Sequence, residues 1–393
     1  MKVAMVAPDD LSTIIFCKTL AKLLTETNGA KVFTVSSLGR YRSEVGKLCS
    51  IHVALPMSRY VSPIHDLFYS WRLYRILREE GISTIITFTT KPNIYGAVVA
   101  RLAGVRTIVA AVRGLGRSFS KAETFRDHIV NKLVVYLYRL SLRCADLVWF
   151  TNRNDRAFFL KGGDVTLGRS FQTANAVDLE EFNIDAVDPA ALLRLQQELS
   201  IGPDNLVVIM VARLIWSKGI REYVGAAKSL SAELPHVKFL LVAPTEDGAA
   251  DAVPESYIHG AEDSANLQWI GFRKDVRDLY ALAHIAVLPS YYKEGGYPRA
   301  LLEPMAMGKP VIAADTVDCR NPVEDGVNGF LVPPKNTEAL TQRIRELLLD
   351  EGLREKYGLK SLEKARREYD DRSVVREVIS ILLRFASRRS TKQ

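Results

Sequence analysis

The feature that most limits the possible folds is a repeated alternation of short apolar runs with helical segments. Runs rich in β-branched residues occupy 2–7, 31–37, 83–89, 106–114 and 146–152. Between them lie segments such as 16–24, in which apolar residues recur at helical spacing. The same alternation begins again at 205–230 and continues through 237–244, 266–272, 284–290, 309–315 and 328–334. Because continuous apolar strands between helices are typical of parallel sheets covered on both faces, the sequence predicts an α/β chain.

Two successive doubly wound domains explain this pattern better than one large sheet. A chain of 393 residues is long enough for two or three cores. The predicted N-terminal domain comprises residues 1–185 together with the final helix, 372–393, and the predicted C-terminal domain comprises 186–371. Residues 188–205 are expected to connect the two domains through a helix of their own. Ligands of such sheets bind beyond the carboxyl ends of the strands, so facing domains would form one central cleft.

Charge is unevenly distributed between the two predicted domains. Residues 1–185 with 372–393 contain 31 Lys and Arg against 17 Asp and Glu, a balance of +14, whereas residues 186–371 contain 22 against 28, a balance of −6. An excess of positive charge attracts an anionic partner such as a nucleic acid, a phospholipid surface or a phosphate-bearing substrate. Ordinary solubilising charge is the alternative explanation.

Two loops of the C-terminal domain carry residues suited to a phosphorylated, hydroxyl-rich ligand. Arg213 and Lys218 follow the first strand of that domain, and together they can neutralise a diphosphate unless they are only surface cations. The segment KEGGYPRALLEPMAMG, residues 293–308, follows a later strand and places Glu294 before two glycines and Glu303 within the next helix. Glycines allow close backbone approach, and a helix start offers free N–H groups to an anion.

These motifs resemble those of a known family. Segments 211–220, 288–315 and 325–334 together look like the nucleotide-binding domain of retaining glycosyltransferases of family four, which have the GT-B fold. The N-terminal segments 63–81, 90–104, 113–120 and 174–182 resemble the branch of this family that builds bacterial capsule, lipopolysaccharide O-antigen and lipid-linked glycan precursors. The resemblance covers almost the whole chain, and it implies two Rossmann-like domains facing a central cleft.

The resemblance also implies a role for each matching residue. The two cations would bind the donor diphosphate, the first glutamate and the glycine backbone would hold the donor sugar, and the second glutamate would bind the nucleotide ribose. The expected catalytic residues are Arg213, Lys218 and Glu294, and the expected donor-binding residues are Gly295, Gly296, Arg299, Leu302 and Glu303.

The chain departs from the family pattern at two places. The two glutamates of the family are eight positions apart, whereas Glu294 and Glu303 are separated by nine. Either the Gly-Gly pair absorbs the extra residue as a bulged turn, or the side chain of Glu294 is displaced. Many relatives also carry a histidine where this chain has Arg113, which stays protonated and cannot act as a general base. Arg113 would contact a phosphate of donor or acceptor, or else pair with a nearby carboxylate.

A third group of residues lies after a strand of the N-terminal domain. Lys91 is expected to meet the diphosphate of an acceptor, and Asn93 a sugar hydroxyl, with Tyr95 beside them. The alternative is a helix-starting turn in which Asn93 is the cap. Together with Arg113 and Gly114, these residues form the predicted acceptor site.

Two helical segments of the N-terminal domain, 65–81 and 125–143, mix aromatic residues with Arg and Lys. Such helices can lie on an anionic membrane leaflet, although an amphipathic helix more often packs against its own sheet. No apolar stretch approaches the roughly 20 residues that span a bilayer, and neither a signal peptide nor a C-x-x-C pair is present. We therefore expect a cytoplasmic protein, peripheral on the inner face of the cytoplasmic membrane, with reduced cysteines and no zinc site.

The sequence as a whole predicts an enzyme that moves a hexose or N-acetylhexosamine from a UDP-sugar to a saccharide on undecaprenyl or another polyprenyl diphosphate. No Asp-x-Asp and no G-x-G-x-x-G follows a strand, so neither a metal ion nor a nicotinamide cofactor is expected, and no nucleic acid is an expected partner. Two alternatives remain at this point. One is a sugar-nucleotide epimerase of the same fold, and the other is a non-catalytic binding partner of other transferases.

Overall fold

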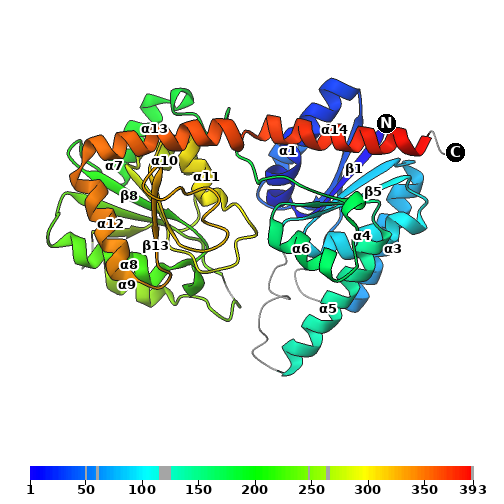
Figure 1. Cartoon of the computed structure of the whole chain (residues 1–393), viewed down its shortest axis with the longest axis horizontal. Helices are drawn as coiled ribbons and strands as arrows, with labels where there is room; N and C mark the ends of the chain where they lie inside the picture. Colours follow the sequence, from blue (N-terminus) through cyan, green and yellow to red (C-terminus); the bar gives the residue numbers. More distant parts are fainter. Residues whose placement is uncertain (49–50, 59–61, 115–124, 247, 263–265, 391–393) are drawn as a thin grey trace. The chain divides into compact units, whose positions relative to one another are not determined.

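The computed structural model describes residues 1–393 except 49–50, 59–61, 115–124, 247, 263–265 and 391–393, and it divides the chain into two compact units (Figure 1). The N-terminal unit comprises Met1–Ala174 and Arg372–Gln393, and the C-terminal unit comprises Asn175–Asp371. The boundary thus lies between Ala174 and Asn175 rather than at 185/186, because Val177 pairs with Asp370 and residues 175–185 belong to the second unit. With this boundary the charge asymmetry is larger, with 31 Lys and Arg against 13 Asp and Glu in the N-terminal unit and 22 against 32 in the C-terminal unit.

The N-terminal unit contains a seven-stranded parallel sheet in the order β3-β2-β1-β4-β5-β6-β7. Its strands are β1 (Lys2–Asp9), β2 (Lys31–Ser37), β3 (Ile51–Ala54), β4 (Thr84–Phe88), β5 (Thr107–Val112), β6 (Leu147–Phe150) and β7 (Ser170–Gln172). Its helices are α1 (Asp10–Asn28), α2 (Arg42–Leu48), α3 (Pro63–Glu79), α4 (Thr90–Leu102), α5 (Phe125–Cys144), α6 (Arg153–Lys161) and α14 (Asp371–Ser390).

Helices cover both faces of this sheet. Leu73 of α3, Ala97 of α4 and Leu142 of α5 lie in the core on one face. On the other face, Leu20 of α1 and Val378 of α14 pack against the strands. The last helix of the chain therefore completes the core of the first unit.

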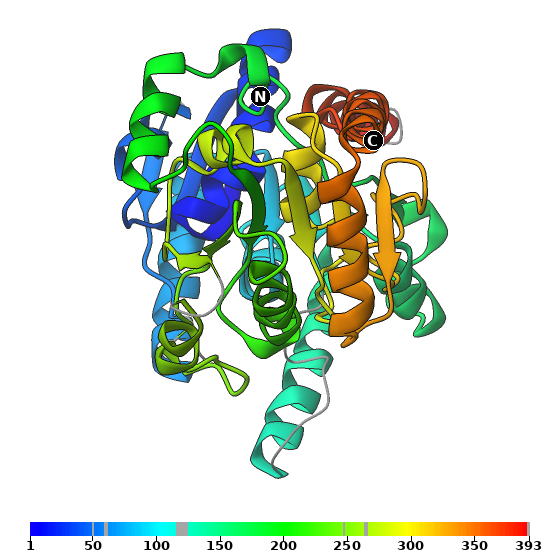
Figure 2. The same cartoon turned by 90° about the vertical axis from the view of Figure 1, so that its left-hand side faces the viewer.

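The C-terminal unit contains a six-stranded parallel sheet in the order β10-β9-β8-β11-β12-β13, with helices on both faces (Figure 2). Its strands are β8 (Leu206–Val211), β9 (Val237–Val242), β10 (Leu267–Trp269), β11 (Ile285–Leu288), β12 (Val311–Ala314) and β13 (Gly329–Val332). Its helices are α7 (Pro189–Glu198), α8 (Ile220–Ser231), α9 (Glu255–Glu262), α10 (Val276–Leu282), α11 (Arg299–Ala306), α12 (Thr337–Leu349) and α13 (Glu351–Glu368).

Both sheets confirm the predicted α/β class with two doubly wound domains. In each unit the strand order reverses once, between β1 and β4 in the first sheet and between β8 and β11 in the second. Loops that leave neighbouring strands at such a point diverge to opposite faces of the sheet and leave a crevice at the carboxyl ends. The loops that follow β8 and β11 are those that carry the predicted donor residues.

Candidate active site

The loops after β8 and β11 are joined by their backbones. The N–H groups of Tyr291 and Tyr292 both donate to the carbonyl oxygen of Ser217, at 2.9 and 3.0 Å. Gly219, at φ 83°, follows the short 3₁₀ turn Trp216–Lys218, and a Cβ added there would lie 2.4 Å from the carbonyl oxygen of Pro289. Only glycine allows this approach, so the sequence at position 219 brings the two loops together.

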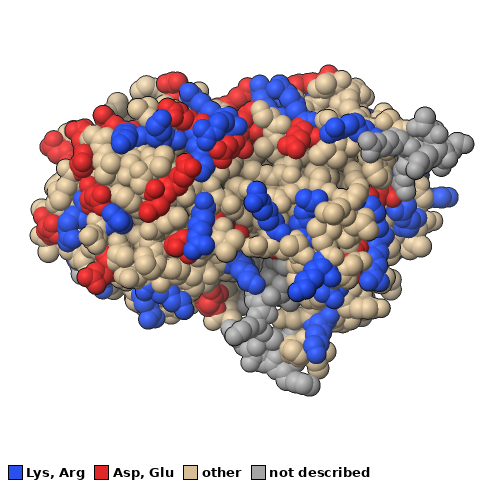
Figure 3. Space-filling model, in the orientation of Figure 1, with Lys and Arg blue, Asp and Glu red and all other residues tan. Residues whose placement is uncertain are grey.

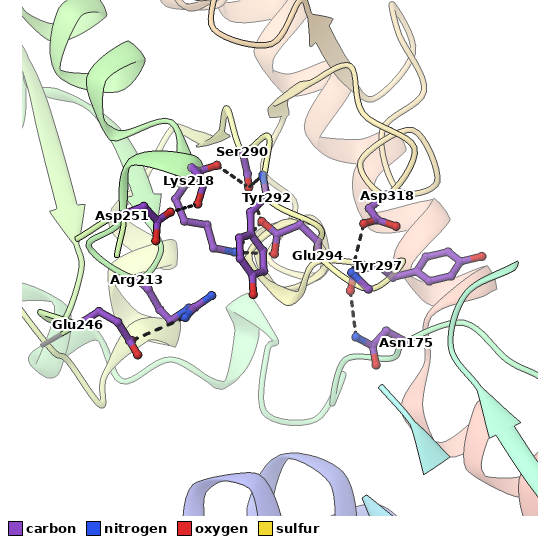
Figure 4. Close-up of polar contacts among 12 residues, drawn as sticks. Asn175, Arg213, Lys218, Glu246, Asp251, Ser290, Tyr292, Glu294, Tyr297 and Asp318 are labelled. Carbon is purple, nitrogen blue, oxygen red and sulfur yellow. Dashed lines mark hydrogen bonds and ion pairs between the residues drawn. The ribbon is translucent and has the colours of Figure 1, made fainter. Parts of the chain in front are cut away.

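Lys218 and Glu294 form a close ion pair between these loops (Figure 4). The Nζ atom of Lys218 lies 2.6 and 2.5 Å from the two carboxylate oxygens of Glu294. Ser290 donates its hydroxyl to Oε1 of the same carboxylate at 2.5 Å. Since Lys218 is only 9% exposed, the pair is largely shielded from water. The extra residue between the two glutamates therefore leaves Glu294 in contact with one of the two predicted cations.

Two consecutive glycines absorb the extra residue as a turn. Gly295 and Gly296 have φ angles of 77° and 115°, in the region that favours glycine. The N–H of Gly295 donates to Oδ2 of Asp318 at 3.2 Å, and Asn321 donates to the carbonyl oxygen of Gly296 at 3.1 Å. Burial raises the pKa of Asp318, and hydrogen bonds from the backbone of residues 294–296 oppose that rise. No motif in the sequence pointed to Asp318 or Asn321.

Arg213 and Lys218 meet at one aromatic ring. The guanidinium carbon of Arg213 lies 5.0 Å from the ring centre of Tyr292, and Nζ of Lys218 lies 5.1 Å from the same centre (Figure 4). Arg213 also lies 3.8 Å from Glu246, and its side chain is 37% exposed. The ring of Tyr292 is attractive to both cations, so it offsets their mutual repulsion. Sequence reasoning missed Tyr292, although it stands only two positions before Glu294.

The helix α11 carries the remaining predicted donor residues. Nε of Arg299 donates to Oε1 of Glu303 at 2.9 Å. Burial raises the pKa of Glu303, and the positive charge of Arg299 only partly opposes this. The prediction for Leu302 is wrong, because its side chain is fully buried and its N–H donates to the carbonyl oxygen of Pro298.

In the N-terminal unit, Asp66 brings two predicted acceptor residues together. Nζ of Lys91 lies 2.8 Å from Oδ1 of Asp66, and the hydroxyl of Tyr95 donates to Oδ2 at 2.9 Å. Lys91 also donates to the carbonyl oxygen of Ser58 at 2.9 Å. Burial raises the pKa of Tyr95, and its hydrogen bond to Asp66 adds to the effect. Asp66 is buried on α3, and no local pattern in the sequence predicts that it would meet α4.

Asn93 has a structural role, and both interpretations of this residue were wrong. Its side-chain amide donates to the carbonyl oxygen of Ala111 at 3.0 Å and to the hydroxyl of Tyr138 at 2.8 Å, while its oxygen accepts from Thr87 at 2.6 Å. Asn93 is fully buried, so it cannot reach a sugar hydroxyl. The cap of α4 is Thr89, and Asn93 lies inside the helix.

Arg113 lies at the carboxyl end of β5 among aromatic rings. Its guanidinium carbon is 4.2 Å from the ring centre of Trp149, 5.2 Å from that of Phe16 and 5.8 Å from that of Phe88. Gly114 follows with φ 104°. The rest of the segment 113–120 lies outside the described residues, so the phosphate-binding role of Arg113 stays a prediction.

Three observations concern metals, thiols and membranes. Among the residues that the structure describes, no group of three His, Cys, Asp or Glu is placed to hold a metal ion. Cys17, Cys144 and Cys319 form no disulfide in the described part of the chain, and Cys49 lies outside the described ranges. Within the same described part of the chain, no helix combines the length and hydrophobicity that a membrane span needs.

Two family models match the chain. Residues 21–163 match the "Glycosyl transferase 4-like domain", and residues 194–363 match "Glycosyl transferases group 1". Together the matches span most of both units.

Curated relatives and solved structures agree with these models. An N,N'-diacetylbacillosaminyl-diphospho-undecaprenol alpha-1,3-N-acetylgalactosaminyltransferase from Campylobacter jejuni is 27% identical over 322 residues, covering 81% of this chain and 80% of that protein. A UDP-Gal:alpha-D-GlcNAc-diphosphoundecaprenol alpha-1,3-galactosyltransferase from Escherichia coli is 26% identical over 70% of this chain and 69% of its own. The Anabaena protein Alr3699/HepE, solved in complex with UDP and glucose, superposes with a TM-score of 0.79 at 20% identity, covering 97% and 99% of the two chains.

Proposed function

Since this chain belongs to the glycosyltransferases of the GT-B fold, we propose that it transfers a hexose or N-acetylhexosamine from a UDP-sugar to a saccharide carried on polyprenyl diphosphate. The product would enter a capsule, a lipopolysaccharide or another cell-surface glycan. The names of the Campylobacter jejuni and Escherichia coli relatives support this acceptor, because both describe transfer to sugars on diphospho-undecaprenol.

The observation that carries the proposal is the convergence of Arg213 and Lys218 on one ring at the switch point of the second sheet. Arg213 and Lys218 would bind the diphosphate of the donor, so no metal ion is needed to neutralise it. Glu294 would accept hydrogen bonds from hydroxyls of the sugar, and Glu303 from the ribose. The C-terminal unit is therefore the proposed donor domain.

Transfer with retention of configuration follows from the family resemblance. The bond between the sugar C1 and the diphosphate oxygen breaks, a bond from C1 to the acceptor oxygen forms on the same face, and the acceptor proton passes to the departing diphosphate. Arg213 and Lys218 would stabilise the charge that develops on that leaving group. Loss of one such group typically lowers the rate by about a hundredfold or more.

The N-terminal unit is the proposed acceptor domain. Lys91 is held by Asp66 at the carboxyl end of β4, where its ammonium group would meet the acceptor diphosphate. Arg113 would provide a second positive charge at the end of β5, the neighbouring strand.

We also propose that the N-terminal unit lies on an anionic membrane surface. The helix α3 packs Tyr69, Leu73 and Leu77 against its sheet, yet it exposes five large hydrophobic residues, Ile64, Leu67, Phe68, Trp71 and Tyr74. Arg72 and Arg75 lie over two of these exposed rings, at 5.4 and 5.5 Å. On the face drawn in Figure 3, Lys and Arg predominate over the N-terminal unit, which has a balance of +18. Exposed aromatic residues beside cations favour an anionic bilayer surface.

Vesicle binding tests the membrane proposal. The wild type should sediment with vesicles that contain phosphatidylglycerol but not with phosphatidylcholine alone, and the Phe68→Ser/Trp71→Ser variant should lose most of this binding. The matched control is Leu349→Ser/Leu359→Ser, because these two leucines are at least as exposed as Phe68 and Trp71 but belong to the acidic unit. Equal binding by the two double variants would contradict the proposal.

Donor turnover tests the transferase proposal against its alternatives. The purified protein is first titrated calorimetrically with UDP, GDP, ADP and their sugars in EDTA, where we expect UDP to bind. It is then incubated with UDP-hexoses and UDP-N-acetylhexosamines, with and without a polyprenyl-diphosphate-linked saccharide. Turnover that requires the lipid acceptor supports a transferase. Interconversion of the donor sugar without an acceptor would identify an epimerase, and binding without turnover would leave a non-catalytic partner.

A further inference from the structure

We propose that Asp318 is a positioning residue of the donor site, whose carboxylate holds the turn after Glu294 in the shape that directs Glu294 toward Lys218. The inference rests on the proposed function, because it assigns to this turn a part in sugar binding. It adds a residue of the loop between β12 and β13 to a site that the sequence built only from the loops after β8 and β11.

The geometry of the turn supports this role. The N–H of Gly295 donates to Oδ2 of Asp318 at 3.2 Å, and the backbone of Glu294 and Gly296 on either side helps to lower the pKa of the same carboxyl group. Gly295 and Gly296 have positive φ angles, and a turn of this kind can direct successive N–H groups toward one anion. An ionised carboxylate has about four acceptor positions, so it can receive the N–H of Gly295 and still attract the neighbouring backbone groups.

Other parts of the unit fix the far side of the same turn. Asn321 donates to the carbonyl oxygen of Gly296 at 3.1 Å, and Asn175 donates to that of Tyr297 at 3.0 Å. The ring of Tyr297 also packs against Tyr369, at 5.7 Å between centres. The neutral groups thus hold the carbonyl side, and Asp318 holds the N–H side next to Glu294. Loss of Asp318 would free the part of the turn that sets the direction of Glu294.

The charge of Asp318 has a cost that a purely structural role does not explain. Its burial and the neighbouring charge of Glu294 both favour the neutral acid, so an ionised carboxylate at this position opposes stability. A charged acceptor binds the N–H of Gly295 more strongly than a neutral amide would, and its charge also attracts the N–H groups on either side. This attraction keeps the turn rigid, which is what a sugar-binding glutamate requires.

The test compares Asp318→Asn with Asp315→Asn. Asp315 starts the same loop, but it is partly exposed and pairs with Arg320, away from the turn. Each of the two changes therefore removes one negative charge from the same loop. The dissociation constants of UDP and of the UDP-sugar found to be the donor are measured by calorimetry for both variants and the wild type. Steady-state kinetics with the lipid acceptor and melting temperatures are measured in parallel.

We expect Asp318→Asn to weaken UDP-sugar binding by about tenfold while UDP binds at least as tightly as it does to the wild type. UDP would contact the two cations and Glu303, and a displaced Glu294 would leave Lys218 available to the diphosphate, so UDP binding should not weaken, whereas the sugar depends on Glu294. The value of kcat should fall as well, and Asp315→Asn should match the wild type. An equal loss of UDP and UDP-sugar affinity, or no loss of either, would overturn the inference. If the wild type itself binds UDP and UDP-sugar no differently, the proposed donor site is wrong, independently of Asp318.

Discussion

Replacing Glu294 with glutamine is expected to destabilise the C-terminal unit while strengthening its binding of UDP. The variant keeps the size and one hydrogen-bonding oxygen of the side chain, but it leaves the ammonium group of Lys218 without its carboxylate at 2.5 Å. The side chains of Lys218 and Glu294 are 11% and 8% exposed, so water replaces the lost charge poorly. Removing one partner of a buried ion pair costs about 3–5 kcal/mol.

We take the lower end of this range, about 3 kcal/mol, because Ser290 and a little solvent remain near the ammonium group. For a unit of this size, each kcal/mol lowers the melting temperature by about 2–4 °C, so we expect a decrease of about 6–12 °C. A diphosphate would then supply the missing negative charge. The stabilisation by saturating UDP should therefore be larger in Glu294→Gln than in the wild type, whereas sugar transfer should be lost.

Thermal unfolding with and without UDP measures both effects. The matched control is the double variant Lys218→Met/Glu294→Gln, in which no charge is left unpaired. A buried pair replaced by neutral groups is often tolerated, so this variant should melt close to the wild type and should lose the response to UDP. If Glu294→Gln melted like the wild type, or if UDP raised the two melting temperatures equally, the ion pair would not have the role that we assign to it.

Three further predictions follow from residues of the two units. Tyr292→Leu should weaken UDP binding about fivefold in calorimetry, whereas Tyr292→Phe, which keeps the ring, should match the wild type. Asn93→Ala should lower the urea midpoint of the N-terminal unit by an amount equivalent to about 2–4 kcal/mol, since it leaves the buried hydrogen-bonding partners of Asn93 unsatisfied. The KM for the lipid acceptor should not change, because Asn93 is too deeply buried to touch a substrate. Glu303→Gln should raise the free energy of unfolding at neutral pH, because burial raises the pKa of Glu303 and the wild type loses stability as pH rises through that folded-state value. The gain should vanish as pH falls to about 4, where the glutamic acid of the wild type is neutral like the glutamine of the variant. Melting temperatures across this pH range check the last prediction, and an unchanged difference at all pH values would contradict it.

The alternation of apolar runs was sufficient to predict the two parallel sheets, because buried parallel strands leave a local signal in the chain. The short strands β3 and β7 were missed, since runs of four and three residues carry too little periodicity. The donor loops were found for the same local reason, because Arg213, Lys218 and Glu294 stand directly after strands.

The residues that the sequence did not reveal act across long distances in the chain. Asp66 meets Lys91 and Tyr95 only because α3 and α4 pack on one face, and Asp318 meets the glycine turn only because β12 lies beside β11. Asn93 was misassigned because polar side chains near a strand end look alike in sequence, whether they face solvent or the core. Its burial depends on Thr87 and Tyr138, which no local pattern places beside it.

The docking of α14 on the first sheet also determines the order in which the two units can mature. Val375, Val378, Ile379 and Leu382 complete a core whose other members were synthesised more than 200 residues earlier, between Val3 and Trp149. During translation, the whole C-terminal unit leaves the ribosome before the N-terminal unit receives its last helix. The first unit must therefore keep an apolar face uncovered until α14 is available to dock, and during that interval this face is exposed to aggregation and to chaperones.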